Sequence, residues 1–341
     1  MKYPFTGLFE YCQQLGIALL ETKKNADQLR IYIQQKDQHH FPANLSFLTQ
    51  KSLHKFIFPK LDPLIDVWHC THQTSWYIPP ANRKLKCVLT VHDLNFLYEE
   101  KSEAKKTTYL KKHQKNIDRA DHIVAISEFT KKDILKYLKV NKPITVIYNG
   151  CNVEEFPKHE QPVYVPSKPF LFTLGTVNAK KNFHTLPCLV QNRNLELIIA
   201  GKTDTAYVEK IMKEAAKYKV IDQIKILGPV SKEDKYWYYK NCFAFAFPSL
   251  AEGFGIPVIE AMSFGKPVFL SKATSLPEIG AEFAYYFENF EASSMNAIFD
   301  AGIHHHQSTQ PEEAIIAHAR QFNWKNSAKK YWEIYHNLLS S

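Results

Sequence analysis

The sequence lacks the patterns that mark secreted, disulfide-bonded or membrane-spanning proteins. Its six cysteines are scattered and no two form a Cys-x-x-Cys pair, which argues against a disulfide framework or a structural zinc site and favours a reducing compartment. The N-terminus has no basic-then-apolar leader, and no apolar run reaches the roughly 18 residues of a membrane span. These absences predict a soluble, cytoplasmic protein.

Several phosphate- and metal-binding signatures are also missing. No Asp-x-Asp occurs, so nothing indicates a metal-held diphosphate, and we expect no metal and no cofactor. "AGKT" at residues 200–203 resembles the end of a P-loop, but the required first glycine would fall at Glu196. "GFGIPV" lacks the third glycine of a dinucleotide fingerprint. No RNA- or DNA-binding motif accompanies the basic charge, so we expect no nucleic-acid partner.

The chain has 341 residues and a formal charge of +9. That length suits two domains of about 150 residues each. Lysines cluster at Lys101–Lys115 and Lys131–Lys142. Such clusters are typical of a solvated helix face, and the alternative is attraction to an anionic surface, either membrane headgroups or a phosphorylated substrate.

Short apolar runs alternate with longer helical patterns along the whole chain, which predicts parallel sheets covered by helices. A proline-rich stretch at residues 156–169 without apolar periodicity indicates a linker between two Rossmann-like α/β domains. In such a pair, small molecules bind at the carboxyl ends of the strands, and the cleft between the domains is the expected place for chemistry. The predicted strands are Ile65–His69, Cys87–His92, His122–Ile126, Ile144–Tyr148, Phe170–Gly175, Leu195–Gly201, Ile224–Gly228, Cys242–Phe247 and Pro267–Leu270.

The stretch "LAEGFGIPVIEAM", residues 250–262, places two glutamates on either side of two glycines and a proline. The glycines allow a sharp turn after a buried strand, and Pro257 suits the first turn of a helix that we expect to end near Phe264. The free backbone N–H groups before that helix would attract phosphate, whereas Glu252 and Glu260 would accept hydrogen bonds from sugar or ribose hydroxyls. The alternative is that both glutamates only stabilise the helix N-terminus.

This stretch, extended to "EGFGIPVIEAMSFGKPV", resembles the donor-site motif of the group 1 (family 4) retaining glycosyltransferases. The same order of segments recurs in "HIVAISEFTKKDI", "VIYNGCNVEEF", "TLGTVNAKKNFHTL" and the C-terminal "FNWKNSAKKYWEIY". The resemblance implies the α/β GT-B fold, two Rossmann-like domains facing each other across a cleft. It implies an acceptor-binding domain over residues 1–160, a donor-binding domain over 165–325 and a C-terminal helix over 326–341.

The resemblance also implies roles for individual residues on the donor side. Lys181 would hold the donor diphosphate with help from Lys180, since a fixed ammonium stabilises a leaving nucleoside diphosphate. Glu252 would bind the transferred sugar and Glu260 the ribose, so both must lie outside the core, with Lys181 beside the turn. The expected donor-binding set is Gly175, Lys180, Lys181, Gly253, Phe254, Gly255, Ile256 and Glu260, and the expected catalytic set is Glu252, Lys181 and His92.

On the other side of the expected cleft, His92 ends a strand and would lie close to the reacting sugar. Gly7, His69 and Gln73 would line the acceptor site, and Asp93 would orient the loop after His92. A zinc site built from His69, Cys70, His72 and His92 is disfavoured because the spacing is unlike that of known sites. "HHH" at residues 304–306 is expected in a loop.

The implied activity is metal-independent, retaining transfer of a hexose from a UDP- or GDP-sugar to a glycan or lipid-linked acceptor. The setting would be cell-envelope polysaccharide or lipopolysaccharide assembly, with peripheral contact to an anionic membrane at its inner face. Alternatives are a GT-B epimerase or phosphorylase, and a non-catalytic nucleotide-sugar-binding protein. The family opens with a β-strand before its first glycine loop, whereas Tyr3–Gly7 already resembles that loop, so we expect a missing first strand and a truncated reading frame.

Overall fold

The computed structural model describes residues 7–80, 84–153, 159 and 161–340. The chain divides into two compact units, Met1–Gly150 with Phe322–Ser341, and Cys151–Gln321. The expected linker at residues 156–169 lies partly outside the described residues. The last helix belongs with the N-terminal segment, so the first unit is built from both ends of the chain.

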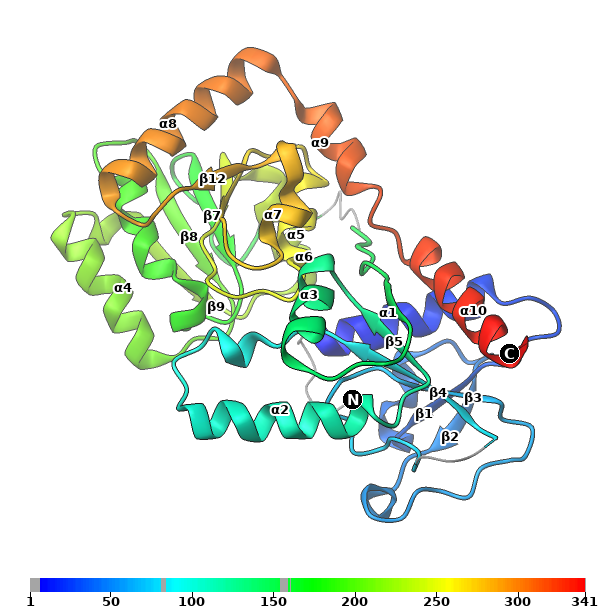
Figure 1. The fold of residues 1–341 in the computed structure, drawn as a ribbon. Helices are drawn as coiled ribbons and strands as arrows, with labels where there is room; N and C mark the ends of the chain where they lie inside the picture. The colour runs from blue at the N-terminus through cyan, green and yellow to red at the C-terminus, as the bar shows by residue number, and fades with distance from the viewer. Residues whose placement is uncertain (1–6, 81–83, 154–158, 160, 341) are drawn as a thin grey trace. The chain divides into compact units, whose positions relative to one another are not determined.

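The first unit contains a four-stranded parallel sheet in the order β3-β4-β5-β6. Its central strands are buried because they are almost wholly apolar, as "KCVLTV" in β4 illustrates. One face packs against α1 and α10, which lie side by side (Figure 1). The elements of this sheet and its helices are α1 (Gly7–Thr22), β3 (Val67–Cys70), β4 (Lys86–Val91), η3 (Asn95–Leu97), α2 (Glu103–Ile117), β5 (His122–Ala125), α3 (Glu128–Tyr137), β6 (Ile144–Val146) and α10 (Trp324–Ser340).

A separate two-stranded parallel sheet follows α1, with β1 (Arg30–Ile33) paired to β2 (Ser46–Thr49). Two short 3₁₀ helices, η1 (Gln35–His40) and η2 (Ser52–Lys55), follow these strands. Only Ile33 is buried in the two strands, which explains why the sequence pattern did not predict them. α1 begins at the first described residue, so the expectation of a missing first strand and most of the expected glycine loop at Tyr3–Gly7 lie outside the described residues.

The second unit contains a six-stranded parallel sheet in the order β12-β11-β10-β7-β8-β9, in which β7 and β10 are neighbours. "HHH" at residues 304–306 lies within α8, so the expected loop there is wrong. The elements are β7 (Phe170–Leu174), η4 (Ala179–Lys181), η5 (Phe183–Val190), β8 (Glu196–Ala200), α4 (Thr205–Lys217), η6 (Ile221–Gln223), β9 (Ile224–Gly228), α5 (Lys232–Asn241), β10 (Ala244–Phe247), α6 (Ile256–Met262), β11 (Val268–Ser271), α7 (Leu276–Gly280), η7 (Ala281–Phe283), β12 (Tyr285–Phe287), α8 (Ala292–Thr309) and α9 (Glu312–Ala319).

All nine predicted strands are present within one or two residues of their expected bounds, and β1, β2 and β12 are additional. The helix expected from Pro257 to Phe264 is α6, with the proline in its first turn. The six cysteines are free thiols. Within the part of the chain that the structure describes, every helix is too short or too polar to cross a bilayer.

Candidate functional site

Lys181 and Glu252 form an ion pair at the carboxyl ends of two neighbouring strands of the second unit. The distance from Lys181 Nζ to Glu252 Oε1 is 2.5 Å, and each side chain retains just over a tenth of its exposure. The ammonium also lies 4.6 Å from the centre of the Phe247 ring. Burial lowers the pKa of Lys181, and the charge of Glu252 opposes that shift. The pair therefore places a cation and an anion, both largely buried, at the carboxyl edge of the sheet.

The local sequence explains why these two side chains meet. Lys181 lies on η4, which follows β7 through a turn at Gly175, and Glu252 lies in the turn after β10. Because β7 and β10 pair in parallel, their carboxyl ends lie at the same edge of the sheet. The side chain of Asn178 accepts a hydrogen bond from the backbone N–H of Lys181 and thereby caps η4.

Two glycines allow the close packing beside Lys181, Gly175 against the lysine side chain and Gly201 against the backbone of Gly175. A Cβ on Gly175 would lie 3.1 Å from Lys181 Cε, and one on Gly201 would lie 2.0 Å from the Gly175 carbonyl oxygen. Both glycines also have positive φ angles, +152° and +128°. The turn that holds Lys181 in place thus requires glycine at both positions.

Hydroxyl groups fix the turn that carries Glu252. Ser249 Oγ donates a 2.5 Å hydrogen bond to Glu252 Oε1, the oxygen that also faces Lys181. The Glu252 backbone N–H donates to Thr274 Oγ1 at 2.8 Å. Ser275 Oγ lies within hydrogen-bond distance of two carbonyl oxygens of the turn, 3.0 Å from that of Glu252 and 2.9 Å from that of Phe254. Ser249, Thr274 and Ser275 were not among the predicted site residues, although Ser249 stands directly after the Pro248 that ends the strand pattern.

The remaining predicted donor-side residues surround this turn. The carbonyl oxygen of Lys180 accepts a hydrogen bond from the backbone N–H of Leu250 at 2.8 Å, which ties η4 to the turn. Gly253–Ile256 lead into α6, and Gly255 has a φ of +118°. Phe254 is buried, so its side chain belongs to the core of the unit.

The sequence predicted that the side chain of Glu260 would lie outside the core at the donor site, but the structure buries it. It is 4% exposed, with Oε1 2.6 Å from Lys235 Nζ and Oε2 2.9 Å from the hydroxyl of Tyr239, both on α5. The apolar residues of α6 face the sheet, and the same helical turn directs Glu260 towards α5. Lys235 and Tyr239 were not predicted, because nothing in the sequence pattern marks them as partners of Glu260.

Several of the predicted residues of the first unit take part in its own hydrogen-bond network. His92 follows β4, and its Nε2 lies 2.8 Å from the carbonyl oxygen of Thr71, so this nitrogen carries the proton. Burial lowers the pKa of His92 to about 4. Gln73 holds the same loop, since its Oε1 accepts from the backbone N–H of His92 and its Nε2 donates to the Asp93 carbonyl oxygen.

His69 and Gly7 occupy different surroundings from those expected. His69 Nε2 lies 2.8 Å from Thr90 Oγ1 and its Nδ1 lies 2.7 Å from the Tyr335 hydroxyl, so both ring nitrogens are engaged inside the unit. Burial lowers the pKa of His69 to about 3. Gly7 begins α1 and is exposed. Asp93 Oδ1 accepts from the backbone N–H of Asn95, in keeping with its expected loop-orienting role.

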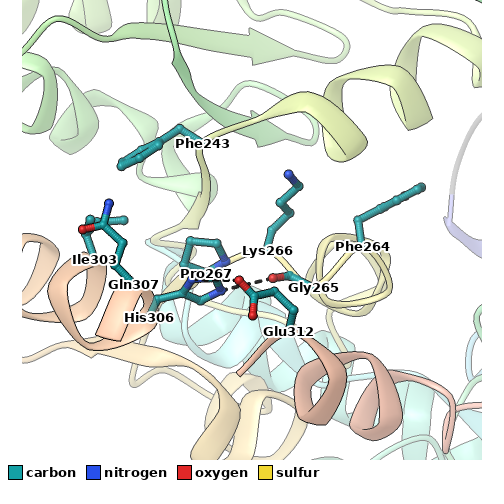
Figure 2. A pocket seen from close by; sticks show the side chains of 9 residues that line it. All are labelled: Phe243, Phe264, Gly265, Lys266, Pro267, Ile303, His306, Gln307 and Glu312. Atoms are coloured by element: carbon teal, nitrogen blue, oxygen red, sulfur yellow. Dashed lines mark hydrogen bonds and ion pairs between the residues drawn. The ribbon is translucent and has the colours of Figure 1, made fainter. Parts of the chain in front are cut away.

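A small cavity lies at the opposite edge of the second sheet. It has a volume of about 150 Å³, and Figure 2 shows His306 between Gly265 and Glu312 in its wall. His306 Nε2 lies 3.1 Å from the Gly265 carbonyl oxygen. Phe243 and Pro267 line the cavity and precede β10 and β11, so the cavity lies at the amino ends of these strands. Ligands of parallel α/β sheets bind at the carboxyl ends, where Lys181 and Glu252 lie.

Two units with parallel sheets, and a lysine–glutamate pair at the carboxyl edge of one of them, are features that the expected GT-B fold requires. The family model described as "Glycosyl transferases group 1" matches residues 155–319, and the model described as "Glycosyltransferase Family 4" matches residues 30–155. Together they span most of the chain, and the protein belongs to this family of glycosyltransferases.

Curated relatives and solved structures are similar over most of the chain. O-antigen chain mannosyltransferase B of Escherichia coli is 25% identical, with 96% of this chain and 94% of that protein covered. Serotype-specific mannosyltransferase WbdA of Escherichia coli is 26% identical over 77% of this chain, which spans only 35% of the length of that relative. Anabaena Alr3699/HepE, solved with UDP-glucose, superposes with a TM-score of 0.70 at 19% identity, covering 100% of this chain and 97% of that one.

Sucrose-phosphate synthase from Thermosynechococcus elongatus superposes equally well. Its TM-score is 0.70 at 18% identity, with 98% of this chain and 94% of that chain covered. At such low identity these superpositions establish the GT-B fold and no more. The predicted fold class and family membership are thereby confirmed.

Proposed function

We propose that the protein transfers a hexose, with retention of anomeric configuration and without a metal ion, from a UDP- or GDP-sugar to a glycan or lipid-linked acceptor. The observation that carries this proposal is the Lys181–Glu252 ion pair at the carboxyl edge of the second sheet, 2.5 Å between Nζ and Oε1. A cation and a hydroxyl-accepting carboxylate side by side match the two halves of a nucleotide-sugar, its diphosphate and its sugar.

Lys181 supplies the positive charge that the departing diphosphate requires. An ammonium has three N–H donors, and Glu252 accepts one of them, which leaves capacity for phosphate oxygens. The site is largely buried, so the interaction between Lys181 and a developing negative charge is stronger than it would be in water. A fixed ammonium fills the role that a divalent cation has in metal-dependent transferases, which supports metal independence.

Glu252 binds the hydroxyls of the transferred sugar. Among the described residues, its contacts with Lys181 and Ser249 both fall on Oε1, so Oε2 is directed to a ligand hydroxyl. A carboxylate held by a lysine and a serine is a poor nucleophile because its charge is already compensated. We therefore infer that retention proceeds by attack of the acceptor on the same face from which the diphosphate departs, rather than through a covalent enzyme intermediate.

The relatives support a particular sugar and setting. O-antigen chain mannosyltransferase B, WbdA and O-antigen chain mannosyltransferase RfbU of Salmonella typhimurium are mannosyltransferases by name, and two of these names specify O-antigen chains. We infer that the transferred hexose is mannose and that the product is an O-antigen or a similar cell-envelope polysaccharide. UDP and UDP-glucose in the solved HepE structures support a nucleotide-sugar donor. Titration with UDP-sugars and with GDP-sugars distinguishes the two nucleotides.

One further role completes the proposal, and the buried Glu260, whose two oxygens face Lys235 and Tyr239, has none in it. His92 is neutral, with its proton on Nε2, and offers Nδ1 as an acceptor for a sugar hydroxyl. Its conservative variant His92→Gln keeps an acceptor and should retain more turnover than His92→Ala.

Transfer assays with site variants test the proposal. Lys181→Ala and Glu252→Ala should each lower turnover at least about a hundredfold, the usual effect of removing one transition-state contact. Lys213→Ala, which removes an exposed lysine of α4, is the matched control and should leave turnover unchanged. Thermal melts confirm that the variants fold, and the anomeric configuration of the product is read by NMR.

The same assays separate the alternatives. Sugar transfer that requires an acceptor supports the proposal, whereas sugar epimerisation without an acceptor identifies an epimerase, and dependence on inorganic phosphate identifies a phosphorylase. Binding of UDP or GDP with neither transfer nor hydrolysis identifies a non-catalytic binding protein. Unchanged turnover in folded Lys181→Ala or Glu252→Ala contradicts the assigned roles.

A further inference from the structure

The first unit carries a basic and apolar surface that the transfer reaction does not use. We call it the 51–60 patch and define it by six exposed residues on η2 and on the segments directly before and after it: Lys51, Leu53, Lys55, Phe56, Ile57 and Lys60. Leu53 is 61% exposed, Phe56 84% and Ile57 66%. Large apolar side chains with this exposure in one short segment are unusual in a protein surface that faces only water.

The fold holds the three apolar side chains together. The backbone N–H groups of Phe56 and Ile57 both donate to the carbonyl oxygen of Leu53, at 3.0 and 3.1 Å. Residues three and four apart on one helical turn lie on the same side of it. The three side chains therefore form one cluster.

Residues His54, Phe58 and Leu61 hold the 51–60 segment against the unit, and the apolar cluster of Leu53, Phe56 and Ile57 stays exposed. His54 Nδ1 lies 2.6 Å from the hydroxyl of Tyr32 on β1. Phe58 packs edge-on against the buried Trp68, with ring centres 5.1 Å apart, and Leu61 packs against the same core. The side chains of Phe58 and Leu61 therefore pack into the core of the unit, whereas those of Phe56 and Ile57 stay at its surface.

The charge of the segment is of one sign. Lys51, Lys55 and Lys60 lie within it, and no aspartate or glutamate occurs between Asp37 and Asp62. Asp62 itself is paired with Arg30, at 3.1 Å. Three uncompensated ammonium groups around an apolar cluster complement a surface that is anionic outside and apolar beneath, which is the structure of a bilayer containing acidic phospholipids.

We propose that the 51–60 patch docks the first unit on an anionic lipid bilayer. Phe56, Ile57 and Leu53 enter the boundary between headgroups and acyl chains, and the three lysines bind lipid phosphates while their alkyl stems stay along the apolar surface. This surface lies outside the residues assigned to sugar transfer, and binding is measured without a sugar substrate, so the inference stands or falls separately from the proposed function.

The experiment is co-sedimentation of the full chain with vesicles. We expect binding to vesicles of phosphatidylethanolamine and phosphatidylglycerol, little binding to phosphatidylcholine alone, and weaker binding as salt concentration rises. Since one lysine near such a surface contributes about fivefold, Lys51→Gln/Lys55→Gln/Lys60→Gln should weaken binding about a hundredfold. Phe56→Ser/Ile57→Ser should weaken it at least about tenfold.

A matched control removes the same charge elsewhere in the same unit. Lys105→Gln/Lys111→Gln/Lys115→Gln changes three exposed lysines of α2 and should weaken binding far less than the patch variant. An equal loss in this control would overturn the proposal, because binding would then follow net charge. Absence of wild-type binding to the anionic vesicles would also overturn it.

The same variants exclude other occupants of the patch. Sedimentation velocity without lipid should give the same oligomeric state for wild type and Phe56→Ser/Ile57→Ser. If the wild type is a dimer that this variant dissociates, the patch is an interface between two copies of the chain and the membrane proposal is wrong.

Discussion

Acidification from about pH 7 to about pH 5 should destabilise the first unit through three half-buried histidines. The pH window is set by the pKa of about 6.5 that these histidines have in the unfolded chain. Burial lowers the pKa of His69 to about 3, and that of His72 and His92 to about 4. Protons therefore bind the unfolded chain but not the folded unit between about pH 6.5 and pH 4. The stabilisation from these neutral histidines is complete above pH 6.5 and is lost as the pH falls.

The size of the effect follows from the shifts. Each proton bound only by the unfolded chain changes the free energy of unfolding by about 1.4 kcal/mol per pH unit. Between about pH 7 and pH 5 each histidine therefore costs about 2 kcal/mol, and the three together cost about 6 kcal/mol. Burial lowers the pKa of His113 and His122 as well, which adds in the same direction. Such a loss is comparable to the whole stability of many domains, about 5–15 kcal/mol.

Urea unfolding followed by tryptophan fluorescence measures this change. Four of the five tryptophans lie in the first unit, and the buried Trp68 reports on its core. We expect the free energy of unfolding of this unit to fall steeply between about pH 6.5 and pH 5.

His72→Asn tests the cause of the fall. His72 Nδ1 accepts from the backbone N–H of Thr74 at 3.2 Å, and an asparagine oxygen can accept the same bond two residues on. The variant should therefore fold and lose about a third of the pH dependence. His304→Asn, at an exposed position on α8, is the control and should change nothing. A pH-independent stability of the first unit, or an unchanged slope in His72→Asn, would refute the reasoning.

Two further predictions concern the second unit. Gly201→Ala places a Cβ 2.0 Å from the Gly175 carbonyl oxygen at a φ of +128°, so it should cost about 3 kcal/mol or more in urea unfolding. Gly228→Ala has a φ of +73° and no neighbour within 4 Å, and should cost only about 1 kcal/mol; equal losses would rule out the steric argument. Lys235→Met leaves the carboxylate of Glu260 buried without its cation and should cost about 3–5 kcal/mol, measured in the same way. Adding Glu260→Gln should recover most of that loss, and failure to recover it would mean that the pair is not the source of the cost.

The sheets were predictable from the sequence because buried parallel strands are continuous apolar runs. "CVLTVH", "FLFTLG" and "CFAFAF" each lie between turn residues, and each became a central strand. β1 and β2 were not predictable in this way, since each has only four residues and, apart from Ile33, none of them is buried. The packing of the C-terminal helix against α1 joins residues more than 300 positions apart, and no local pattern encodes such a contact.

The site was predictable in part. The position of Lys181 beside Glu252 follows from glycine turns at the ends of two strands, which the sequence displays. Glu260 was expected at the ligand, but helical geometry turns it towards Lys235, and the partner of a buried charge depends on tertiary packing. His69 illustrates the same limit, because a histidine at a strand end is engaged by Thr90 and Tyr335 instead of facing solvent.

Calorimetric titration of UDP- and GDP-sugars into folded Lys181→Gln and Glu252→Gln variants tests the central claim most directly. Loss of the ammonium should weaken nucleotide-sugar binding about a hundredfold, the value of a charged hydrogen-bond pair of about 2.7 kcal/mol. Glu252→Gln should bind the free nucleoside diphosphate as the wild type does, yet lose its preference for the sugar-bearing form and its turnover. Equal affinity of wild type and Lys181→Gln for every nucleotide-sugar would contradict the account.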